Sequence, residues 1–166
     1  YHPLPYAARS ALLKASERVP VLIAAGNDGQ ALESTCYGRS MLTLAQASYK
    51  PTNQGRIFLV ASTKFSMGAL GNTNNEKLSN FSNYSQKNSK HVLKAPGENI
   101  KLGNFAIQTL GINALHGTSI ATPLALIKAI YLVNKQQKKY LIKPTSTIQN
   151  HANSEKLTIL DALIQL

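Results

Sequence analysis

The chain has 166 residues, 43% of them hydrophobic and 15% charged, which is the balance of one globular domain with a packed core and excludes an intrinsically disordered protein. Its longest apolar runs are strand-sized, well short of the ~20 residues that a membrane-spanning helix needs. Cys36 is the only cysteine, so an internal disulfide is excluded and a cysteine-based metal site is not expected.

The formal net charge of +11 raises the question of nucleic-acid binding. The cations, however, are spread along the whole chain. The single cluster lies at the polar end of a predicted helix, where positive charge suits the helix dipole, and consists of Lys135, Lys138, Lys139 and Lys143. No glycine–aromatic RNA motif accompanies it. We therefore expect a solvated surface and no nucleic-acid partner, and an acidic partner segment outside this sequence would also account for the excess charge.

The N-terminal third of the chain predicts a helix that leads into a buried strand. Residues 6–18 contain strong helix formers throughout, with small and apolar side chains at helical spacing. Residues 19–25, VPVLIAA, are apolar on both faces, which is typical of a strand in the middle of a parallel sheet, and a GNDG turn follows. Residues 31–55 are ambiguous, part loop and part short helix or strand.

Two more strands and a long helix follow. RIFLVAS at 56–62 predicts a second buried strand, and HVLKAPG at 91–97 predicts a third that closes in a Pro-Gly turn. Residues 103–115 supply a hairpin or two edge strands, 119–139 form the clearest helix, with Pro123 in its first turn, and 156–166 form a short last helix. Helices that alternate with buried strands over long connections predict an α/β fold with a largely parallel sheet.

Ser119 stands in HGTSIATP, between a turn that Gly117 permits and an apolar helix. A serine at a helix start is usually an N-cap. It can also be a nucleophile, if the turn exposes its hydroxyl and its own N–H, at the positive end of the helix, receives a developing oxyanion. Asn27 also has two interpretations: a residue suited to tight turns, or a side-chain amide that points into the crevice at the carboxyl end of a parallel sheet.

Five segments in order resemble the subtilisin-like serine peptidases. VPVLIAAGNDG resembles the family's strand and turn with the oxyanion-hole asparagine, RIFLVAST its next sheet strand, LSNFSNYS its Ser-Phe-Ser segment, LKAPGENI its Ala-Pro-Gly turn and HGTSIATP its nucleophile motif. The resemblance implies a three-layer subtilisin-like α/β fold with a mostly parallel sheet. It also implies that Ser119 is the nucleophile, that Asn27 and the Ser119 N–H are oxyanion donors, and that Gly117 and Thr118 are positioning residues.

The sequence departs from this family at two points. Leu124 follows Pro123, where the family usually has a histidine, and this packing position carries little weight. In the family, moreover, a triad aspartate and histidine precede the asparagine strand, and a serine needs such a base to become nucleophilic. The histidines here are His2, His91, His116 and His151, and the aspartates are Asp28 and Asp161. His116 is expected to line the cleft, because a side chain so close to Ser119 in sequence would have to fold back on its own turn.

We therefore interpret residues 1–166 as the C-terminal part of a subtilisin-like peptidase domain, with the Asp- and His-bearing part upstream or in another chain. The expected function is that of a serine-type endopeptidase that hydrolyses peptide bonds through an acyl-enzyme on Ser119 and is inactive as this portion alone. The alternative is a non-catalytic, peptidase-like binding or scaffold domain.

The expected partners are a polypeptide substrate and the upstream half of the same domain, with no membrane partner. Neither a cofactor nor a metal is expected in this portion, whose few carboxylates are not clustered, although calcium in the full-length parent is compatible with the family. Residues 48–55, SYKPTNQG, are expected near a substrate side-chain pocket. A secreted or exported protein is favoured over a cytoplasmic one.

Overall fold

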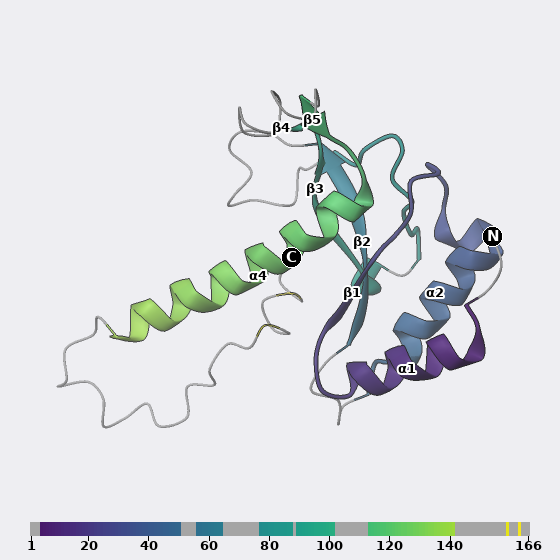
Figure 1. Ribbon diagram of the computed structural model, residues 1–166, viewed down its shortest axis with the longest axis horizontal. Coiled ribbons are helices and arrows are strands. Elements are labelled where there is room, and N and C mark those ends of the chain that lie inside the picture. The colour runs from purple at the N-terminus through teal and green to yellow at the C-terminus, as the bar shows by residue number, and fades with distance from the viewer. Residues whose placement is uncertain are drawn as a thin grey trace.

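The computed structural model describes residues 4–50, 56–64, 77–87, 89–101, 113–141, 159 and 163. Its elements, in chain order, are α1 (Tyr6–Ser16), β1 (Val21–Ala24), the 3₁₀ helix η1 (Leu32–Ser34), α2 (Cys36–Ala47), β2 (Ile57–Lys64), the 3₁₀ helix η3 (Ser89–His91), β3 (Val92–Glu98), β4 (Ile100–Lys101), β5 (Ala114–Leu115) and α4 (Thr118–Leu141). Figure 1 shows their arrangement. None of the helices in the described part is long and apolar enough to cross a membrane.

The strands β1, β2 and β3 lie side by side in that order and all run parallel, which confirms the predicted sheet. One expectation needs correction. β1 has the sequence of a central strand, yet it is an edge of the sheet that the structure describes, and its four side chains are only half-buried. Its apolar character on both faces has a direct cause, because helices lie over both faces of the sheet.

Alternating side chains divide the molecule into three layers. On one face, Phe58 and Val60 of β2 pack against α4, while on the other face Ile57 and Leu59 pack against α2. Fully buried alanines at 121, 125 and 129 form the contact face of α4, and such small side chains let the helix lie close to the sheet. The order α4, sheet, then α1 with α2 confirms the α/β fold class (Figure 1).

Several boundaries differ from those expected from the sequence. α4 begins at Thr118, so Pro123 falls in its second turn and not its first, and the Ser119 carbonyl lacks the helical N–H that residue 123 would normally donate. Of the hairpin or two edge strands expected at 103–115, the structure describes β5, which pairs antiparallel with β4, a strand that ends before this range. Residues 102–112 lie outside the described residues. Of the last predicted helix, Ile159 and Leu163 are described, both helical, and Leu163 is buried against the α4 layer.

Candidate active site

The carboxyl end of the parallel sheet gathers three segments that are distant in sequence. Asn27 follows β1, Gly97 lies near the end of β3, and Gly117 precedes α4. The Gly117 N–H donates to the Gly97 carbonyl at 2.8 Å, which ties the start of α4 to the sheet. A Cβ on Gly97 would lie 2.6 Å from the Gly117 carbonyl oxygen and 2.6 Å from Ser62 Oγ, so this close approach requires glycine.

Asn27 is held by Thr118 through the oxygen of its side-chain amide. Asn27 Oδ1 accepts from the Thr118 backbone N–H at 2.9 Å and from the Thr118 hydroxyl at 3.0 Å, and the Gly26 N–H donates to that same hydroxyl at 3.2 Å. Because a backbone N–H can only donate, it fixes which end of the amide is oxygen. The Asn27 N–H₂ group is therefore the end that is not bonded to Thr118, and the Asn27 oxygen caps the first N–H of α4.

The space beside Gly117 is where Asn27 and Ser119 meet. A Cβ on Gly117 would lie 3.1 Å from Ser119 Oγ and 3.5 Å from Asn27 Nδ2. These two atoms are therefore no farther apart than the sum of the two distances, well below the ~10 Å at which they could not both reach one carbonyl through contacts of ~3 Å. Gly117 has φ +146°, a backbone conformation that side chains rarely adopt, so glycine is favoured here and no side chain stands between the two groups.

Ser119 is exposed, and both its hydroxyl and its N–H lack a hydrogen-bond partner among the described residues. The next two N–H groups, of Ile120 and Ala121, both donate to the Gly117 carbonyl at 3.1 and 3.2 Å. The N-cap interpretation of Ser119 therefore has no bond to support it, since Asn27 performs the capping. What remains is an exposed hydroxyl, an unbonded N–H at the positive end of a helix and an amide N–H₂, all facing one small space.

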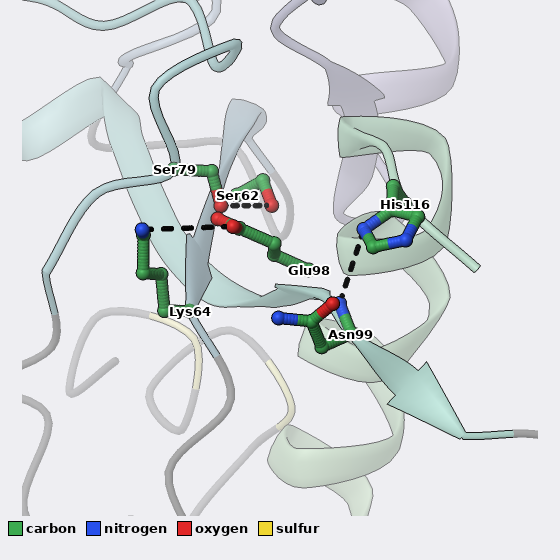
Figure 2. Close-up of polar contacts among 6 residues, drawn as sticks. All are labelled: Ser62, Lys64, Ser79, Glu98, Asn99 and His116. Carbon is green, nitrogen blue, oxygen red and sulfur yellow. Dashed lines mark hydrogen bonds and ion pairs between the residues drawn. The ribbon is translucent and has the colours of Figure 1, made fainter. Parts of the chain in front are cut away.

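His116 lies near this turn, but its ring is bonded elsewhere. Its Nδ1 accepts from the Asn99 backbone N–H at 3.2 Å, as Figure 2 shows. A neutral His116 then carries its proton on Nε2 and has no second acceptor for the Ser119 proton. Figure 2 also shows the polar side chains near this end of β2 and β3, where Ser62 Oγ lies 2.9 Å from Ser79 Oγ and Lys64 pairs with Glu98 at 3.7 Å.

His91 lies at the other end of the sheet. It directly precedes β3, whose length at ~3.3 Å per residue separates His91 from the Gly97 end by roughly 20 Å. Burial lowers the pKa of His91 below its usual range, and the Lys90 and Arg56 cations lower it further. His91 is therefore excluded as the base for Ser119 by position. His2, His151 and Asp161 lie outside the described residues, and among the described ones no three His, Cys, Asp or Glu side chains group as metal ligands.

The expectation for residues 48–55 is wrong where the structure describes them. Ser48 Oγ accepts from the Ile57 N–H at 2.9 Å, at the amino end of β2. The Tyr49 ring stacks under the Arg56 guanidinium at 4.0 Å and meets the His91 ring edge-on. Residues 48–50 therefore lie at the end of the sheet opposite to Asn27, because α2 runs back along the sheet before β2 begins. Residues 51–55 lie outside the described residues.

Sequence reasoning missed Asn83. It belongs to the segment LSNFSNYS, whose resemblance to the family's Ser-Phe-Ser segment implies no role for this residue. In the structure Asn83 is buried, and its side chain bonds to the turn that carries Asn27. The only signal in the sequence is the pair of asparagines in a segment otherwise typical of a surface loop, and this signal does not tell which of them turns inward.

A family profile described as the subtilase family matches residues 5–158. No curated protein matches the chain at a significant level. Among solved structures, the chain is similar to one described as a self-cleaved protease domain of PatA, with 21% sequence identity and a TM-score of 0.42. That alignment covers 81% of this chain and 40% of the other, so this chain spans less than half of that protein's length.

Proposed function

This chain belongs to the subtilase family, and on that premise we propose that it is the nucleophile-bearing part of a serine endopeptidase. The observation that carries the proposal is the convergence of the Ser119 hydroxyl and the Asn27 N–H₂ on the space beside Gly117, where a Cβ would lie 3.1 Å from Ser119 Oγ and 3.5 Å from Asn27 Nδ2. A peptide carbonyl in that space would meet a nucleophile at its carbon and hydrogen-bond donors at its oxygen.

The reaction assigns one task to each group. Ser119 Oγ attacks the carbonyl carbon, its proton passes to a base, and the oxyanion accepts hydrogen bonds from Asn27 Nδ2 and the Ser119 N–H. The C–N bond then breaks, the amine leaves with the proton that the base returns, and an acyl-enzyme ester remains on Ser119. Water activated by the same base hydrolyses that ester and restores the hydroxyl. Thr118 and Gly117 act by position, Thr118 through the Asn27 amide and Gly117 by leaving room.

We propose that the base and its aspartate come from an upstream half of the same domain. Two surfaces support this assignment. The face of α4 turned away from the sheet exposes large apolar side chains, which are Leu126, Ile127, Ile130 and Tyr131. β1 is an apolar strand with one edge unpaired in the described sheet. A polypeptide that adds a strand to β1 and covers α4 would bury both surfaces. If that polypeptide were acidic, it would also offset the net charge of +11.

A fluorophosphonate probe, which forms a covalent bond with an activated serine, tests the proposal. We expect no labelling of residues 1–166 alone and labelling at Ser119 in the complete protein. In the complete protein, Ser119→Ala should abolish labelling and peptide cleavage, and His116→Ala should leave both within about threefold, since removing an imidazole that is not the base spares the general-base contribution. Asn27→Ala should slow acylation by about 10²–10³-fold, the loss measured for the corresponding donor in subtilisin, a member of this family.

Each result separates two interpretations. Strong labelling of the isolated chain at Ser119 would show that it contains its own base, with His116 the first candidate. A complete protein that is folded but is neither labelled nor able to cleave peptides would contradict the peptidase proposal and favour a non-catalytic binding domain.

A further inference from the structure

The segment around Asn83 lies along the turn that carries Asn27, although more than fifty residues separate them. Backbone hydrogen bonds connect the two at four places: Asn83 N to Gly26 O at 2.9 Å, Gly29 N to Phe81 O at 2.7 Å, Tyr84 N to Gln30 O at 3.1 Å and Leu32 N to Tyr84 O at 2.8 Å. The turn after β1 is thus fixed against a second segment and is not a free loop.

The Asn83 side chain makes every hydrogen bond that an amide can make. Its Nδ2 donates to the Ala25 carbonyl at 3.1 Å and to Asp28 Oδ2 at 3.1 Å. Its Oδ1 accepts from the Asp28 N–H at 3.1 Å and from the Gln30 N–H at 3.0 Å. The side chain is 4% exposed, so water does not replace these bonds when they are lost.

Gly26 is matched to this contact. It has φ +103°, and a Cβ at this position would lie 2.5 Å from Asn83 Nδ2. Only glycine therefore allows the Asn83 amide to reach Ala25 and Asp28, which flank Gly26 and Asn27 on either side. Asn27 is then held twice, by Asn83 through the backbone around it and by Thr118 through its own amide oxygen.

We propose that Asn83 is a positioning residue for the oxyanion hole. It fixes the backbone from Ala25 to Gln30 so that the Asn27 N–H₂ group stays aimed at the carbonyl oxygen beside Ser119. Such a donor is effective only when it is already in place, since a displacement of ~1 Å can cost about 10²-fold in rate. This inference rests on the proposed peptidase function, and its test separates the two.

The kinetic test uses the complete protein and a matched pair of variants. Asn83→Ala should lower kcat and the rate of fluorophosphonate labelling by about 10- to 100-fold with KM within about threefold, because the donor acts in the transition state. Asn80→Ala is the control, as Asn80 lies in the same segment, is exposed and makes no side-chain hydrogen bond among the described residues. Its rates should match the wild type.

A double variant distinguishes positioning from general damage. If Asn83 acts through Asn27, then Asn83→Ala should cost less than about threefold in a protein that already carries Asn27→Ala, since the two losses are not additive. An equal 10- to 100-fold loss in both backgrounds would overturn the proposal. If Asn83→Ala does not fold, Asn83→Asp takes its place, because it keeps the acceptor for the Asp28 and Gln30 N–H groups and loses the two donors. Combining it with Asp28→Asn restores a bond between these side chains and should recover part of the rate.

Hydrogen exchange on the complete protein gives an outcome that needs no activity. The backbone N–H groups of Asp28 and Gln30 donate to Asn83. Their exchange rates are therefore compared among three variants: Asn83→Ala, Asn83→Asp/Asp28→Asn and the control Asn80→Ala. Faster exchange in Asn83→Ala alone supports the positioning role even if the complete protein proves inactive, which would contradict only the peptidase function. Unchanged protection would overturn the role of Asn83 whatever the activity.

Discussion

The Thr118 hydroxyl offers the sharpest perturbation of the site, because the residue is buried, at 1% exposure, and the hydroxyl bonds to two groups of the Asn27 turn. Thr118→Val keeps the shape and removes the hydroxyl. The Gly26 N–H then loses its acceptor, and Asn27 Oδ1 keeps only the bond from the Thr118 backbone N–H at 2.9 Å. Thr118→Ser is the matched change, since it keeps the hydroxyl and removes one buried methyl group.

The two variants should differ in their effect on the labelling rate, although both lose stability. An unsatisfied buried donor costs about 1–3 kcal/mol, so Thr118→Val should lower the free energy of unfolding by that amount and lower Tm. Its labelling rate should fall by about tenfold, which is less than the loss of the whole Asn27 donor, because one bond still orients the amide. Thr118→Ser should lose about 1 kcal/mol from the missing methyl group and keep the labelling rate within about twofold.

Thermal unfolding and fluorophosphonate labelling of the complete protein, measured on the same three samples, check this prediction. If the hydroxyl orients Asn27, Thr118→Val loses both stability and labelling rate, whereas Thr118→Ser loses stability alone. If both properties decline in parallel in Thr118→Val and Thr118→Ser, or if Thr118→Val labels at the wild-type rate, the hydroxyl does not orient Asn27.

Two other predictions concern the support of the site and the far end of the sheet. Gly97→Ala should cost about 1–3 kcal/mol and slow labelling, because its Cβ would meet the Gly117 carbonyl oxygen at 2.6 Å and displace the nucleophile turn; an unchanged Tm would contradict the contact. His91 is held neutral, with its pKa lowered from 6.5 by burial and by the Lys90 and Arg56 cations. The unfolded chain therefore binds the proton more readily, so the free energy of unfolding should be constant at higher pH and decrease as pH falls through about 6.5 toward the lowered pKa. His91→Asn should weaken the pH dependence of the urea midpoint measured between about pH 5.5 and 7.5. An unchanged dependence of the midpoint on pH would exclude His91 as its cause.

The sequence by itself determined α1, the three parallel strands and α4 of the layered fold, and it left the region of α2 ambiguous. Residues 57–60 are apolar on both faces, and this pattern alone predicts a strand buried between two layers, because each face of a strand must be covered. Asn27 could be placed at the carboxyl end of a parallel sheet from the sequence, because it follows a buried strand. Its pairing with Ser119 follows from the resemblance to the subtilisin-like peptidases.

Only the tertiary structure decided which other residues support that pair. The sequence pattern of β1 reports that both its faces are covered and says nothing of whether both its edges are paired, so its edge position was not predictable. Residues 48–50 lie at the end of the sheet opposite to Asn27, because α2 reverses the chain direction. Asn80 and Asn83 are the same residue type in the same segment, and the structure buries Asn83 against the Asn27 turn and leaves Asn80 exposed. Hydrophobic periodicity records local burial, whereas hydrogen bonds between residues 55 to 92 positions apart are set by how distant segments pack.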